Sequence, residues 1–268
     1  MTARTDKTLA SFPRTFDLAP GKHASPEDGM CAMEVVAFLA GGPHTDHPRC
    51  ACPIVSGYVL HINDNMPDDQ RQRLLPYLPR LVDSVSEDHE QARHEYFAWQ
   101  AVRVFAPAAL RAQGYRRYAR SLENAATLFR ARDIGETIQH GVMAKEGDGE
   151  LTPAHLAAHR AGSAAGAAMW FASQRNDFFR GASAITPYTE CADAAAGAAF
   201  QAHRAGVTDI WDKAHWLSGR KTSPAHPVGM KTGRPMYADM YVSRTTSPGS
   251  AGNLGWQAER DSARPPIC

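Results

Sequence analysis

Alanine dominates one stretch of this chain and restricts the folds that are open to it. Residues 151–216 contain 20 alanines. Alanine is the best helix former, and its small side chain lets helices pack closely. The whole chain of 268 residues has only seven isoleucines and twelve valines, and no segment alternates apolar and polar residues with period two. We therefore predict an all-α fold, an irregular bundle of about seven helices.

Capping and termination signals place the individual helices. Ser25 and Pro26 predict a helix start, because serine caps a helix and proline fits its first position. Pro76 and Pro79 are expected to bend or break the third helix, and Pro107 to kink the fourth. The expected helical segments are 25–40, 53–62, 67–82, 86–114, 121–146, 153–174, 193–203 and 210–217.

Composition divides the chain into three parts. Residues 1–24 are polar and are expected to form a flexible N-terminal arm, while 25–217 form the helical domain. Within that domain we distinguish a Cys/His module, 25–83, from the alanine-rich helices of 84–217. The last part, 218–268, contains six prolines, six glycines and six serines, and too few apolar residues for a core of its own. We predict that it is an extended tail.

Charge is unevenly distributed between these parts. The chain carries 29 lysines and arginines against 28 aspartates and glutamates, so its net charge is +1. The tail holds seven basic and three acidic residues, which makes it basic and leaves the rest of the chain slightly acidic. This near-neutral total argues against a nucleic-acid surface over the whole protein, although the tail permits local nucleic-acid contact. A protein partner or a homo-oligomer is the other interaction that we expect.

Neither membrane insertion nor secretion is expected. The chain lacks the run of about 18 apolar residues that a spanning helix needs. Its first 20 residues lack the apolar segment of a signal peptide, and five cysteines are an odd number for a disulfide framework. We therefore predict a cytoplasmic protein without membrane contact.

Cysteine and histidine gather in one short window, which is the candidate site. Cys31 and Glu34 are three residues apart on the first predicted helix, so both face one side. His47 and Cys50 have the same spacing in the loop that follows. Thiolate, imidazole and carboxylate groups all bind zinc, and four of them complete a tetrahedral structural site. The predicted metal ligands are Cys31, Glu34, His47 and Cys50, with His44, Asp46 and Cys52 as substitutes.

Two other interpretations of this window stay open. In the first, the window is a packed helix–loop corner in which the cysteines are buried thiols. In the second, it is catalytic, through a metal-bound water or a cysteine nucleophile with a histidine base. The second interpretation would use Cys31, Cys50 or Cys52 as nucleophile, His44 or His47 as base, and Asp46 to orient the base.

The same window carries a recurrent sequence pattern. It consists of a D-G-x-C-x-M-E helix, an L-A-G turn, an S-D-H-P-x-C loop, an N-D turn and an R-x-x-L-L-x-x-x-P-R-L-V segment. The matching positions are 28–34, 39–41, 45–50, 63–64 and 71–82, with Thr45 in place of the serine. These motifs resemble a group of uncharacterised bacterial and phage proteins that continue into alanine-rich helices. The group has no established activity, so the resemblance implies a recurrent module over 23–83 and no reaction.

Three functions are compatible with these features. The first is a non-enzymatic helical interaction protein whose module is held together by the corner of Cys31, Glu34, His47 and Cys50, with zinc as a candidate structural ion. The second is an enzyme that uses the same corner. The third is a phage or host structural component whose tail clasps a neighbouring subunit. The first is our prediction, and the other two are its alternatives.

Overall fold

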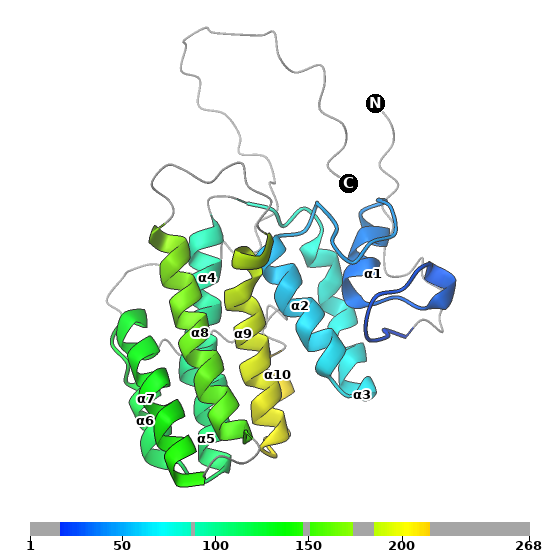
Figure 1. Ribbon diagram of the computed structural model, residues 1–268. Helices are drawn as coiled ribbons and strands as arrows, with labels where there is room; N and C mark the ends of the chain where they lie inside the picture. The colour runs from blue at the N-terminus through cyan, green and yellow to red at the C-terminus, as the bar shows by residue number, and fades with distance from the viewer. Residues whose placement is uncertain (1–16, 87–88, 147–150, 174–184, 215–268) are drawn as a thin grey trace, which may run out of the picture.

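The computed structural model describes residues 17–86, 89–146, 151–173 and 185–214. These residues form helices joined by turns, and the only β pairing among them is an isolated bridge between Leu18 and Met30. Figure 1 shows the long helices running side by side in one bundle. The prediction of an all-α fold is confirmed. The predicted tail, 218–268, lies outside the described residues.

The N-terminal layer consists of short helices. Ser25 and Pro26 begin only a single 3-10 turn, so the predicted start of the first helix is wrong. Gly29 follows with a φ of 121°, which ends helical geometry. The α-helix then begins at Ala32, with Cys31 as its N-cap. The elements of this layer are η2 (Pro26–Asp28), α1 (Ala32–Leu39), α2 (Pro53–Asn65), α3 (Asp68–Arg71) and η3 (Gln72–Leu81).

Prolines interrupt two of the predicted long helices. The third helix changes after α3 into the 3-10 helix η3, which contains Pro76 and Pro79. In the fourth, a π-helical turn precedes Pro107, which has no N–H to bond to the carbonyl one turn back. The predicted helix 86–114 is therefore three consecutive elements along one axis. They are α4 (Glu90–Gln100), η5 (Ala101–Phe105) and α5 (Ala106–Ala112).

The alanine-rich half supplies the longest helices. The predicted segment 121–146 is interrupted, because one helix ends at Glu123 and the next begins at Leu128. Thr127 caps the second of these: its Oγ1 accepts the N–H of Arg130 at 3.2 Å. The elements of this half are α6 (Arg116–Glu123), α7 (Leu128–Glu146), α8 (Pro153–Ser173), α9 (Ile185–Arg204) and α10 (Ile210–Ala214).

Helices α8 and α9 form the centre of the bundle. Helix α8 packs against α4, α5, α7 and α9, and α9 also packs against α2 and α10. One cluster of buried side chains extends from Leu18 to Ala214, so the N-terminal layer and the alanine-rich half share a core. Tyr58 of α2 links the two parts: its hydroxyl donates to the carbonyl of Ala214 at 3.2 Å, and its ring lies 4.7 Å from that of Phe97.

Helices α7 and α8 come into backbone contact at two glycines. A Cβ atom added at Gly135 would lie 3.0 Å from both the Cα and the N of Gly162, and 3.1 Å from the carbonyl oxygen of Ala158. These neighbours are backbone atoms, which cannot rotate away. A Cβ added at Gly166, one turn along α8, would meet only the Cδ of Arg132 at 3.6 Å. A side chain at Gly135 would therefore clash with the backbone of α8, whereas one at Gly166 would fit.

Replacing Gly135 by alanine should destabilise the fold. Overpacking costs about 1–3 kcal/mol, and the helix propensity of alanine returns roughly 1 kcal/mol of that. Gly166→Ala is the matched control, because it gains the propensity without the clash. Urea unfolding followed by circular dichroism should show a lower midpoint for Gly135→Ala and an unchanged or higher one for Gly166→Ala. Equal shifts in both variants would contradict the close helix contact.

Candidate functional site

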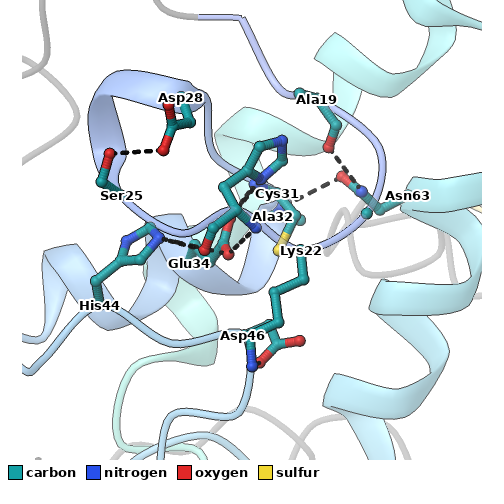
Figure 2. Close-up of polar contacts among 12 residues, drawn as sticks. Ala19, Lys22, Ser25, Asp28, Cys31, Ala32, Glu34, His44, Asp46 and Asn63 are labelled. Carbon is teal, nitrogen blue, oxygen red and sulfur yellow. Dashed lines mark hydrogen bonds and ion pairs between the residues drawn. The ribbon is translucent and has the colours of Figure 1, made fainter.

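A fully buried carboxylate stands at the centre of the predicted site. Glu34 is the third residue of α1 and has no exposed surface. It forms a capping box with Cys31, since its Oε2 accepts the backbone N–H of Cys31 at 2.7 Å. Figure 2 shows Glu34 between His44 and the start of α1 at Cys31. The predicted neighbourhood of Cys31 and Glu34 is therefore present.

His23, from the segment before the helix, supplies the other strong contacts of this carboxylate. Its backbone N–H donates to Oε1 of Glu34 at 2.8 Å, and its ring Nδ1 lies 2.8 Å from Oε2. Burial opposes ionisation of Glu34, but the hydrogen bonds from His23 and Cys31 outweigh it and lower the pKa of the carboxyl. An ionised carboxylate only accepts hydrogen bonds, so Nδ1 of His23 carries a proton.

His44 completes the cluster from the loop after α1. Its Nε2 lies 3.1 Å from the carbonyl oxygen of His23 and 3.5 Å from Oε1 of Glu34. Because a carbonyl oxygen accepts, Nε2 of His44 is the donor in this contact. We call His23, Glu34 and His44 the Glu34 cluster. It brings together three segments of chain: the one before α1, the helix itself and the loop that follows it.

A second set of polar contacts fixes the segment before α1 on the surface of α2 and η3. Asn63 accepts the N–H of Ala32 at 3.2 Å and donates to the carbonyl of Ala19 at 3.0 Å (Figure 2). The amide of Gln72 exchanges hydrogen bonds with the backbone of Leu18, at 2.7 and 3.0 Å. Leu18 is 2% exposed. The packed region therefore begins at Leu18 among the described residues, within the segment that we expected to be a flexible arm.

The cysteines of the predicted site are buried thiols. Cys31, Cys50 and Cys52 each have at most 1% exposure, and none forms a disulfide. Burial is the largest cause that raises the pKa of the Cys31 thiol, to about 12, and the nearby charge of Glu34 adds to it. A thiol in this state is a poor nucleophile at neutral pH. These properties favour the packed-corner interpretation for Cys31.

The other predicted ligands take different places. His47 has a 61% exposed side chain, and its Nδ1 pairs with Oδ1 of Asp46 at 2.8 Å. Burial opposes ionisation of Asp46, yet the His47 ring and the charge of Lys22 lower the pKa of that carboxyl. Within the described ranges, no three or more histidine, cysteine, aspartate or glutamate side chains are grouped so that they could hold a metal ion. Zinc binding stays a prediction.

Sequence reasoning missed His23 and Asn63. His23 lies in a polar stretch without helical periodicity, and it reaches Glu34 within a loop that places Leu18 beside Met30 at the start of α1. Asn63 was noted only as part of a turn, although it lies within α2 and is fully buried. A buried asparagine needs hydrogen-bond partners, so its place on the apolar side of a helix was the signal that could have identified it.

A surface groove in the alanine-rich half was not predicted. It has a volume of about 470 Å³ and lies between α7 and α8, with Glu190 of α9 at its border. Its floor includes Gly166, and its sides carry Trp170, which is 44% exposed. We call it the α7–α8 groove. Its polar and charged lining includes Arg132, Glu136, His159 and Glu190.

Comparison with known proteins gives no relative. No protein-family model matches the chain, and no curated protein or solved structure matches it either. The resemblance to uncharacterised bacterial and phage proteins therefore stays a prediction. Among the described residues, no helix is both long enough and apolar enough to cross a membrane.

Glu34→Gln should destabilise the N-terminal layer at neutral pH. The glutamine NH2 group would face N–H donors that now bond to the carboxylate, at a cost of about 2 kcal/mol. The pKa of Glu34 is lowered, so its contribution is present above the ordinary carboxyl pKa and is lost as the pH falls through the folded-state value. Chemical unfolding at several pH values should show a difference from wild type that is largest near neutrality and shrinks in acid.

Glu27→Gln is the control for this experiment, because Glu27 is an exposed acid in the same layer. It should leave the unfolding midpoint nearly unchanged at every pH. Equal stability of wild type and Glu34→Gln at neutral pH would contradict the structural role of the buried carboxylate.

Proposed function

We propose that this protein is a non-enzymatic helical interaction protein that binds basic protein segments in the α7–α8 groove. In this proposal the Glu34 cluster has a structural role, which is to hold the N-terminal layer on the bundle. The observation that carries the proposal is a groove lined by the exposed indole of Trp170 together with two carboxylates, Glu136 and Glu190, with Gly166 leaving space between them.

The charges of the groove favour a cationic ligand. Glu136 and Glu190 contribute two negative charges, against the single positive charge of Arg132. That guanidinium is already held by acids of its own helix, at 3.6 Å from Asp133 and 3.8 Å from Glu136. An ammonium or guanidinium group over the face of an indole gains roughly 0.5–2 kcal/mol. Lysine and arginine side chains therefore suit both the ring of Trp170 and the carboxylates of the groove.

The shape of the groove favours an extended chain. Gly166 leaves its floor open, since a Cβ there would have only the Arg132 side chain as a neighbour. A groove of this volume is within the usual range for ligand sites, about 300–1,000 Å³. It is open along a helix pair, and peptide segments commonly bind in such clefts through a few anchoring side chains.

The contacts of the corner support a structural role there. Both oxygens of Glu34 accept backbone hydrogen bonds, and the thiol of Cys31 is protonated at neutral pH by virtue of its raised pKa. A catalytic carboxylate or thiol would need access to a substrate. Zinc binding, an enzymatic use of this corner, and a role as a phage or host structural component stay predictions, as do nucleic-acid contact through the tail and a cytoplasmic location.

Thiol labelling tests the enzymatic alternative. We expect Cys31, Cys50, Cys52 and Cys191 to resist a small maleimide in the folded protein at pH 7, because all four are buried. Mass spectrometry of the digested product identifies the modified positions. Denatured protein is the control and should be labelled at each of them. Rapid modification of Cys31, Cys50 or Cys52 in the folded state would contradict the structural interpretation.

Peptide binding tests the groove. A fluorescent peptide of alternating lysine and alanine should bind the full chain in low salt, as measured by fluorescence anisotropy. Trp170→Ala should weaken its binding about fivefold, corresponding to about 1 kcal/mol of cation–π energy. The double variant Glu136→Gln with Glu190→Gln should also weaken it.

Val85→Ala and Glu27→Gln are the controls, because each changes an exposed residue outside the groove. Both should leave the affinity for the peptide unchanged. Equal weakening by the control and groove variants would overturn the proposed function.

A further inference from the structure

We propose that the resident ligand of the α7–α8 groove is the protein's own basic segment 231–244, which binds within the same molecule. The inference rests on the proposed function, since it names the basic segment that the groove takes. It joins a described surface to a part of the chain that lies outside the described residues.

Charge and side-chain type make this segment the fitting one. Residues 231–244 contain three cations and one acid, and they also contain two tyrosines and two methionines. The cations suit the carboxylates of Glu136 and Glu190, and the tyrosines and methionines suit the exposed ring of Trp170. The basic residues of the remaining tail, at 220–221 and 260–264, have no such aromatic neighbours on both sides.

The chain is long enough for the contact to form within one molecule. Helix α10 ends at Ala214, so residues 215–230 connect it to the segment, and 16 residues in extended form can span about 50 Å. A helical domain of this size is on the order of 40 Å across, so the segment can reach any face. A tethered ligand has an effective concentration in the millimolar range, which favours the chain's own segment over a second copy.

Chymotrypsin digestion of the full chain tests the contact. The enzyme cleaves after aromatic residues, so Tyr237 and Tyr241 report on the segment and Trp256 is an internal reference farther along. In wild type, cleavage after the two tyrosines should be slower than in Trp170→Ala or in Glu136→Gln with Glu190→Gln, by about twofold or more. Cleavage after Trp256 should be the same in all three proteins.

A pair of charge-matched variants tests the same contact through the lysine–alanine peptide. Arg234→Gln with Arg244→Gln should free the groove, and the full chain should then bind the peptide more tightly than wild type does. Arg260→Gln with Arg264→Gln removes the same charge outside the segment and should leave the affinity at the wild-type value.

The outcomes separate this inference from the proposed function. Equal tyrosine cleavage in wild type and groove variants, with the lysine–alanine peptide still bound, overturns the inference and leaves the function standing. Failure of that peptide to bind even after Arg234→Gln with Arg244→Gln overturns both. If protection of the two tyrosines from cleavage increases with protein concentration, and light scattering shows dimers, the segment binds to a second copy. That result overturns binding within one molecule.

Discussion

The fully buried negative charge of Glu34 organises the N-terminal layer. Removing a carboxylate from water is costly, and it is tolerated only where hydrogen-bond donors replace the solvent. Glu34 receives such donors from the start of α1 and from His23, while His44 bonds to the carbonyl of His23. The donors come from chain segments that would otherwise be separate. The position of the segment before the helix and that of the loop after it are thus set by the needs of one side chain.

Buried polar groups find hydrogen-bond partners in the same way from the end of α2 into α3 and η3. Asn63 and Gln72 bind backbone groups of the segment before α1, and the buried guanidinium of Arg71 donates to the carbonyls of Asn63 and Met66 at 2.6 and 2.7 Å. The last contacts satisfy carbonyls at the end of α2, where no helical partner follows. Here the buried polar residues connect separate segments of the chain by hydrogen bonds, while apolar side chains make up most of the core.

Local features of this fold could be predicted from the sequence, and features that join distant segments could not. Cys31 and Glu34 meet because helix geometry fixes a spacing of three residues, and the alanine-rich helices follow from composition. His47 has the same spacing from Cys50 but lies in a loop, where spacing does not determine direction, and its side chain turns outward. The partnership of His23 with Glu34 depends on the loop that places Leu18 beside Met30, and the helix-start signal at Ser25 gives no indication of this loop.

In the candidate site, too, the sequence indicated the local pattern of residues but not the contacts that they make. The pattern of cysteine, histidine and glutamate in one window identified a region of polar contacts, but it could not tell a ligand set from a hydrogen-bonded cluster. The α7–α8 groove has no comparable signature in the sequence, because it arises where the glycines of α8 meet side chains of α7 and α9. Such a surface is a property of packing between helices, which the residue pattern of each single helix does not reveal.

The π-helical turn at Ala101–Phe105 has a consequence for the phase of the helices around it. A π turn takes up one residue more than an α turn over nearly the same rotation. The apolar positions of α5 are therefore shifted by one residue in sequence relative to those of α4, while both sets still face the same neighbours. In this way α4, η5 and α5 all meet α8 and α9. Deleting one residue of this turn would restore α-helical spacing and leave the inward face of α5 in place.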